Sequence, residues 1–225
     1  MRKLPPGQKE SAIFPRFGLP QYANRFPKEV DNIRISIGGD VEEFELSEEL
    51  NTLPRINQVS DFHCVTTWSK LDLSWSGYRF SDFYETFILP KISTNITFVV
   101  LKAQDGYKTS LPLTDLLQQD VLLADQLNNQ PLTIEHGAPI RIVAPAHYGY
   151  KNLKHLHRIE FYAEKQTVKQ GYLSFMDHPR ARVANEERAS AGPSILFRWL
   201  YKFGIKGTIK DFEKATAEYK AKLPS

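Results

Sequence analysis

The stretch His63-Cys64-Val65-Thr66-Thr67-Trp68-Ser69 contains the only cysteine of this 225-residue chain. A single cysteine cannot form a disulfide within the chain, so Cys64 is either a small buried packing residue or a chemically active group. We predict a strand from Ile56 that leads into Cys64. A thiolate is a soft ligand for transition metals, so the residue types alone leave both packing and metal chemistry open.

Two other kinds of site are weaker interpretations of this cysteine. Zinc sites usually combine several Cys or His at short spacing, but only His63 is adjacent and no Cys-x-x-Cys pair exists. A Cys–His hydrolase is conceivable, since the chain has six histidines. However, the residues after Cys64 are bulky, unlike the small residues that line an oxyanion hole.

The composition fits one large domain, or one domain with an appendage. Hydrophobic residues make up 41% of the chain, enough for a core, and the net charge of +3 is too small to predict a nucleic-acid partner. We expect a cytoplasmic protein, because the first residues lack the apolar segment of a secretory signal. A lone thiol also suits a reducing compartment.

Proline spacing and hydrophobic alternation predict a mixed, β-rich body. Five prolines from Pro5 to Pro27 indicate that residues 1–30 form an extended arm lying on that body. Further strands are expected at 33–37, 44–46, 97–101, 139–143 and 158–162, the segment 139–143 being half-buried, with turns at 38–40, 105–106 and 128–131. Ser47 and Ser81 are predicted to cap short helices, the second with Phe83, Tyr84, Phe87 and Ile88 on one face.

Past about residue 190 the pattern becomes helical. Residues 195–203 are rich in aromatics, and Gly204 can end them as a helix. Helical spacing resumes after Thr208, with apolar positions at Ile209, Phe212, Ala215, Tyr219 and Leu223. We therefore predict a body over 1–190 and a helical appendage over 191–225. The helix at 195–203 is expected to cover the protein's own core, with partner docking or membrane-surface contact as the alternative.

Four ordered blocks resemble the sulfite-oxidase-type molybdopterin oxidoreductases, in register from about residue 4 to residue 165. The blocks are Leu4-Pro5-Pro6-Gly7-Gln8, the run from His63 to Tyr78, residues 105–113, and the run from His136 through Tyr148-Gly149-Tyr150-Lys151 to Glu160. The resemblance implies that family's molybdopterin-binding fold, without its haem or dimerisation domains. It also implies molybdenum held by the sulfurs of the pterin and by one protein thiolate, Cys64.

The second long block supplies the cofactor-binding candidates. By resemblance, His136 and Arg141 contact the cofactor, and Asn152, Lys154 and His155 form a phosphate-contacting cluster, with Lys151 beside them. An arginine can hold a phosphate through two hydrogen bonds. Without the resemblance, Arg141 would be a polar position on a half-exposed strand. The group Lys151, Lys154 and His155 would be a solvated basic loop.

Weaker candidates lie nearer the N-terminus. Arg16-Phe17 and Asn24-Arg25-Phe26 resemble segments that lie across the cofactor in the family, and Asn24 and Arg25 are the candidates taken from them. His63 is expected either to hydrogen-bond near the metal or to pack. Asp105 is expected to form a turn with Gly106 rather than to touch the pterin, and Trp68 is expected in the core.

The substrate is less defined than the cofactor. Thr67 stands where related sequences often carry Arg, which argues against an anion such as sulfite. The resemblance implies two-electron oxygen-atom transfer on a small sulfoxide, N-oxide or sulfite-like molecule. It also implies a separate electron-transfer partner that is haem-, flavin- or quinone-linked. The alternatives are a binding module without turnover and, from a third class, a thiol hydrolase.

Overall fold

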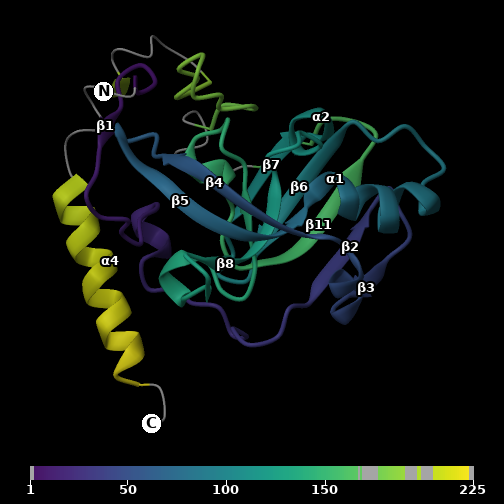
Figure 1. Ribbon diagram of the computed structural model, residues 1–225, viewed down its shortest axis with the longest axis horizontal. Coiled ribbons are helices and arrows are strands. Elements are labelled where there is room, and N and C mark those ends of the chain that lie inside the picture. The colour runs from purple at the N-terminus through teal and green to yellow at the C-terminus, as the bar shows by residue number, and fades with distance from the viewer. Residues whose placement is uncertain (1–2, 167, 169–176, 191–196, 199–204, 223–225) are drawn as a thin grey trace.

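The computed structural model describes residues 3–166, 168, 177–190, 197–198 and 205–222. Two β-sheets form the body, and helix α4 (Ile205–Lys220) lies along one edge of it, beside the N-terminal arm (Figure 1). The predicted α+β, β-rich architecture with a helical C-terminal segment is therefore confirmed.

The first sheet is organised around a long antiparallel hairpin. Its path runs β1-β5-β8-β10, while β4 pairs with β5 and β9 pairs with β8. Gly77 of β5 lies opposite Ala124 of β8, where an added Cβ would come within 2.1 Å of the Leu123 carbonyl oxygen, so only glycine allows this approach. The strands are β1 (Lys9–Glu10), β4 (Arg55–His63), β5 (Trp68–Arg79), β8 (Leu122–Leu127), β9 (Gln130–Pro131) and β10 (Arg141–Val143).

The second sheet has the order β3-β2-β11-β6-β7. Its central strand β11 pairs in parallel with β2 and antiparallel with β6, so the last strand of the body inserts between earlier ones. The strands are β2 (Ile35–Gly39), β3 (Phe44–Leu46), β6 (Phe98–Ala103), β7 (Lys108–Pro112) and β11 (Leu156–Tyr162). The predicted strands near 33–37, 44–46, 97–101 and 158–162 are thus confirmed.

The main core joins the two sheets and the helical segment after β5. Ile37, Leu101 and Ile159 of the second sheet pack in one cluster with Leu123 and Ile142 of the first. A second cluster on the first sheet surrounds Trp75 and receives Phe14 of the arm. The arm is therefore part of the packed structure, as its prolines predicted.

The two predicted short helices are present, but neither serine makes a capping hydrogen bond through its side chain. The Ser47 side chain makes no capping hydrogen bond; instead Glu49 accepts one from the Ser47 backbone N–H at 2.9 Å. Ser81 lies inside α1, because that helix already begins at Phe80. These elements are η1 (Pro20–Tyr22), η2 (Glu48–Thr52), α1 (Phe80–Phe83), the π-helical η3 (Tyr84–Ile88), η4 (Leu89–Lys91), α2 (Leu113–Leu116), η5 (Ile134–His136) and η6 (Gly149–Lys151).

Helix α4 packs against the protein's own arm. Tyr219 stacks on Phe26 with ring centroids 4.0 Å apart, and Phe212 lies 6.5 Å from Phe17. The predicted helix at 195–203 falls almost entirely outside the described residues, as does Leu223, and the domain boundary near 190 stays a prediction. Within the part of the chain that the structure describes, no helix combines the length and apolarity needed to cross a bilayer.

Candidate molybdopterin site

Cys64 lies at the tip of the β4–β5 hairpin. Its backbone N–H donates to the Trp68 carbonyl at 2.8 Å, and its carbonyl accepts from the Thr67 N–H at 3.2 Å. Residues 64–67 connect the two strands, with Thr67 in the left-handed region at φ 78°. The long paired strands therefore hold the thiol at a fixed position at one end of the first sheet.

Two side chains from distant segments support this tip. Gln8 of the arm donates to the Cys64 carbonyl at 3.1 Å and accepts from the Ser69 hydroxyl at 3.0 Å. Arg188, which is fully buried, donates to the carbonyls of Val65 and Pro6. Sequence reasoning missed both roles; for Gln8 the only signal was its place in the first family-like block, and for Arg188 there was none.

The thiol faces a pocket of about 500 Å³. Several parts of the chain meet there: the arm, the hairpin tip, the β6–β7 turn, the 149–155 loop, Asp177 and α4. The residues that line it are Phe14, Pro15, Arg16, Phe17, Gly18, Leu19, Pro20, Tyr22, Phe62, Cys64, Val65, Thr66, Trp68, Asp105, Tyr107, Gly149, Tyr150, Asn152, Leu153, Lys154, His155, Asp177, Ile205, Thr208 and Phe212.

The Cys64 thiol is buried beside one hydroxyl and two cations. Its Sγ lies 3.1 Å from the Thr66 Oγ1. Burial raises the pKa of the thiol, while the Thr66 hydrogen bonds and the charges of Arg188 and Lys154 oppose that rise. In this setting a bound cation would favour the thiolate, because a metal ion is the largest local charge in such a site.

Basic groups are concentrated on one side of this thiol. Burial and the neighbouring charges of Arg141 and Arg16 hold the pKa of Lys154 well below its usual value, against the opposing charges of Asp105 and Glu135. Burial lowers the pKa of His155 to about 3. Burial, together with the positive charges of Lys154 and Arg141, lowers the pKa of His136 to about 4. The cationic forms repel one another here, and an anionic ligand would offset that repulsion.

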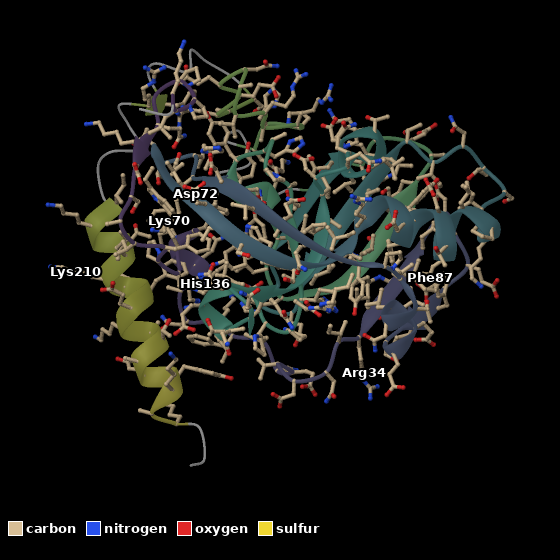
Figure 2. The ribbon with its side chains drawn as sticks, viewed as in Figure 1. Arg34, Lys70, Asp72, Phe87, His136 and Lys210 are labelled. Atoms are coloured by element: carbon tan, nitrogen blue, oxygen red, sulfur yellow. The ribbon has the colours of Figure 1, made fainter. Side chains whose placement is uncertain are left out.

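His136 and His155 face this region with different hydrogen bonding. The Nδ1 of His155 lies 2.7 Å from the Ala138 carbonyl. The Nδ1 of His136 is buried and has no hydrogen-bond partner among the described residues, while its ring stacks on Phe14 at 4.8 Å. Figure 2 shows His136 between α4 and the sheets, whereas Lys210 projects from the outer face of that helix.

Arg141 is placed differently from the sequence interpretation. The strand 139–143 was expected to be half-buried, but β10 is buried throughout. The guanidinium donates to the carbonyls of His136 at 2.9 Å, Asn152 at 3.1 Å and Ile142 at 3.3 Å, so three of its five N–H donors already have partners. It lies behind the pocket lining, and its contact with a phosphate stays a prediction.

Lys151, predicted as a cofactor contact, and Asn152 support the loop from inside the protein. Lys151 is fully buried, and its ammonium donates to Asp177 at 2.8 Å and to the Ser110 carbonyl at 3.0 Å. The Asn152 side chain accepts from the Ala144 N–H at 2.7 Å and donates to neighbouring carbonyls. The solvated basic loop is therefore a wrong description of this segment.

The loop also depends on one glycine. An added Cβ at Gly149 would come within 2.3 Å of the Phe62 ring, so the glycine lets the loop approach the end of β4. Since Phe62 precedes Cys64 by two residues, this contact ties the loop to the hairpin tip.

The weaker candidates fall in several places. His63 is buried with its Nδ1 2.7 Å from the Ser69 hydroxyl, and it does not line the pocket. Asn24 and Arg25 are exposed on the arm, outside the lining. Asp105 forms the expected turn by accepting from the Tyr107 N–H at 2.9 Å, and it lines the pocket as well.

Trp68 was expected in the core but lines the pocket. It is half-buried, and Phe17 meets it edge-on with ring centroids 6.1 Å apart. Its position follows from the hairpin, because it is the first residue of β5 after the tip. Only the tertiary contact with the arm turns this tryptophan into a pocket wall.

This donor set fits molybdopterin carrying molybdenum. Such a cofactor requires one soft protein donor for the metal and a basic region for its phosphate. Cys64 supplies the thiolate, and Lys154 and His155 line the same pocket, while His136, with its unpartnered Nδ1, lies outside the lining but close enough for the charge of Lys154 to lower its pKa. Among the described residues no group of three or more His, Cys, Asp or Glu could hold a metal by itself.

Relatives of known name share this region of the chain. A family model described as "Oxidoreductase molybdopterin binding domain" matches residues 23–170. The "Uncharacterized oxidoreductase YuiH" of Bacillus subtilis (strain 168) is 35% identical over 167 residues, which cover 72% of this chain and 80% of that protein. The "Protein-methionine-sulfoxide reductase catalytic subunit MsrP" of Xanthomonas axonopodis pv. citri is 25% identical over 190 residues, or 72% and 59% of the two chains.

A solved structure shows the same fold. The sulfane dehydrogenase SoxCD from Paracoccus pantotrophus aligns with a TM-score of 0.55 and 20% identity, covering 66% of this chain and 43% of that one. The predicted resemblance, the enzyme class and the molybdopterin cofactor are therefore confirmed. The chain belongs to the family of sulfite-oxidase-type oxidoreductases that carry the molybdopterin-binding domain.

Proposed function

We propose that this protein reduces a small neutral S-oxide or N-oxide by two-electron oxygen-atom transfer at the Cys64 site. The observation that carries the proposal is the lining of the pocket, which combines the Cys64 thiol with the basic Lys154 and His155 and with a largely apolar set of side chains. When bound, the molybdenum cofactor supplies the oxygen-atom exchange. The relative MsrP, named as a sulfoxide reductase subunit, supports the same direction.

The charges of the lining favour a neutral substrate over sulfite. Among the described lining residues, the two lysine or arginine cations are Arg16 and Lys154. Arg16 donates to the carbonyls of Ala23 and Arg25, both at 2.8 Å, so those N–H donors already have partners. Lys154 belongs to the basic region proposed for the cofactor phosphate. An anionic substrate would therefore lack a dedicated cation.

The absence of Arg at position 67 contributes less than the sequence suggested. Thr67 is buried on left-handed backbone and lies outside the pocket lining. The argument against sulfite thus rests on the lining itself rather than on this single position.

In the proposed reaction the sulfur–oxygen or nitrogen–oxygen bond breaks, and sulfur or nitrogen gains two electrons. The oxygen leaves as water after taking up two protons from solvent. The electrons come from a separate donor that is haem-, flavin- or quinone-linked. Residues 195–203, predicted as a possible docking segment, fall mostly outside the described residues, and the expected cytoplasmic location stays a prediction.

A dye-coupled assay tests this proposal. Protein expressed with molybdate is analysed for molybdenum and pterin, and then assayed for reduction of a sulfoxide and an N-oxide with a reduced viologen, and for sulfite oxidation with an electron-accepting dye. We expect close to one equivalent of metal and faster turnover of an oxide than of sulfite. Faster sulfite oxidation would contradict the substrate class. Less than about a tenth of an equivalent of metal would contradict the proposal that the protein carries the molybdenum cofactor, since folded sites bind their metals tightly.

The same assay separates an enzyme from a binding module without turnover. Replacing Cys64 by Ser should abolish reduction in an enzyme while part of the pterin remains bound. A binding module would show no turnover before or after the change. Inactivation by thiol alkylation of protein that contains no metal would instead indicate the thiol hydrolase.

A further inference from the structure

The pocket has one side that lies outside the family-matched segment. The matched residues 23–170 include Cys64, Lys154 and His155. That side comes from the arm before residue 23 and from α4. We call this side the outer wall, formed by Phe14, Phe17, Leu19, Ile205, Thr208 and Phe212.

The outer wall is held together by aromatic packing. Phe212 is buried, and its ring lies 6.5 Å from that of Phe17, which in turn meets Trp68 edge-on at 6.1 Å. Both rings therefore have neighbours that fix their orientation and still line the pocket.

Arg16 also lines the pocket, and most of the N–H donors of its guanidinium already have partners. Its guanidinium lies 4.3 Å from the Phe26 ring centroid and 4.9 Å from that of Phe212. Its hydrogen bonds go to arm carbonyls and, at 3.4 Å, to the Thr216 hydroxyl of α4. The cation thus joins arm and helix, and the surface that remains for a ligand is apolar.

We propose that the outer wall determines substrate selectivity by binding an apolar group, aromatic or branched aliphatic, attached to the oxide's sulfur or nitrogen. Phe17 and Phe212 are the specificity-determining residues. This inference rests on the proposed function for the reacting atom. An aromatic substituent gains contact area and ring-to-ring packing on this wall, whereas a methyl group gains little of either.

The test compares two substrates on the holoenzyme. Methyl phenyl sulfoxide carries the aromatic group, and dimethyl sulfoxide lacks it. Phe212→Leu keeps a buried apolar side chain on α4 but removes the aromatic ring. We expect kcat/KM for methyl phenyl sulfoxide to fall about tenfold in this variant, mostly through a higher KM. A tenfold change corresponds to about 1.4 kcal/mol of lost packing. The value for dimethyl sulfoxide should stay within about twofold, and metal and pterin content should not change.

Two further variants guard against a folding artefact. Thr208→Phe narrows the pocket from the same helix, and it should lower kcat/KM for methyl phenyl sulfoxide more than for dimethyl sulfoxide. Phe87→Leu is the matched control, because Phe87 lies at the opposite end of the molecule from α4 (Figure 2). It should leave both substrates unchanged. Equal losses for the two substrates in Phe212→Leu, or no loss for either, would overturn the role of the wall.

A binding measurement separates this inference from the proposed function. Methyl phenyl sulfide is titrated into the resting holoenzyme and followed by calorimetry. If no oxide is reduced but the sulfide binds the wild type about tenfold tighter than Phe212→Leu, the proposed reaction fails and the apolar wall stands. If oxides are reduced but the sulfide binds both proteins equally, or neither, the wall fails and the reaction stands.

Discussion

The two sides of the Cys64 pocket are built by different physical means. The inner side, comprising the hairpin tip and the 149–155 loop, uses backbone ladders and hydrogen bonds made by buried polar side chains. The outer wall uses rings from segments about two hundred residues apart in the chain. Hydrogen bonds fix positions sharply, whereas apolar packing tolerates changes of shape.

This difference indicates where chemistry and selectivity reside. The inner side holds a thiol and a basic region at set positions, as a bound metal cofactor requires. The outer wall carries contacts that can change without moving that cofactor. Changes on the inner side should therefore affect every substrate, and changes on the outer wall should discriminate among them.

The largest effect is expected at Cys64. Cys64→Ser replaces the soft ligand by a weaker one, so turnover of all substrates should fall at least about a thousandfold, or about 4 kcal/mol in activation free energy. Pterin content should remain measurable, because the basic region is intact. The dye assay combined with metal and pterin analysis checks this, and retained activity toward any oxide would refute Cys64 as the metal ligand.

The second-largest effect is expected from replacing the fully buried Arg188. Arg188→Met leaves the Val65 and Pro6 carbonyls without their Arg188 donor and removes one of the two arginines paired with the Glu186 carboxylate. We expect about 3 kcal/mol lower unfolding free energy, as for other broken buried pairs, together with slower turnover of every substrate. Urea unfolding measures the free energy of unfolding, and the dye-coupled assay measures the turnover.

Arg182→Met is the matched control, because Arg182 pairs with Glu187 at a more exposed position and should cost less than about 1 kcal/mol. Equal losses in the two variants would mean that Arg188 does not support the hairpin tip.

A smaller effect is expected from Lys154→Met. Loss of one charge-assisted contact to an anionic group should cost about 1.5–3 kcal/mol of cofactor binding, so pterin retention after dialysis should fall about tenfold or more. Lys108→Met, an exposed lysine of β7, serves as the control. Unchanged retention in Lys154→Met would remove Lys154 from the cofactor site.

The smallest effect is expected from breaking the ion pair that joins the end of α4 to Glu135. Lys220 pairs with Glu135 at 2.5 Å. Partial burial raises the pKa of Glu135, but the hydrogen bonds from Lys220, its own backbone N–H and Thr133 outweigh it and lower that pKa to about 2. Because Lys220 is largely exposed, Lys220→Met should cost no more than about 1 kcal/mol at pH 7.

The pH dependence of that pair has a definite sign. A depressed pKa in the folded state contributes stability above the unfolded value, near pH 4.5, that is lost as the pH falls toward 2. The difference between wild type and Lys220→Met should therefore shrink over this window, as followed by urea unfolding at several pH values. A constant difference would show that the pair does not titrate as described.

Local sequence patterns predicted much of the fold. Alternation in 33–37 and 158–162 matched β2 and β11, because strand periodicity follows from which face is buried. The helix after Ser47 starts where it was predicted, although the Ser47 side chain makes no capping hydrogen bond, whereas the helix near Ser81 already starts at Phe80. The alternative that Lys151 lies in a solvated loop was wrong, because the burial of its ammonium depends on Asp177, 26 residues further along the chain.

The sequence by itself determined the cofactor class, since Cys64 and four ordered blocks carry ligand chemistry in their residue types and spacing. Only the tertiary structure decided that Trp68, Phe17 and Phe212 line the same pocket, and that Arg188 supports the hairpin tip. The physical reason is that ligand chemistry belongs to individual side chains and short spacings. Burial and contact between distant segments instead depend on how the whole chain packs.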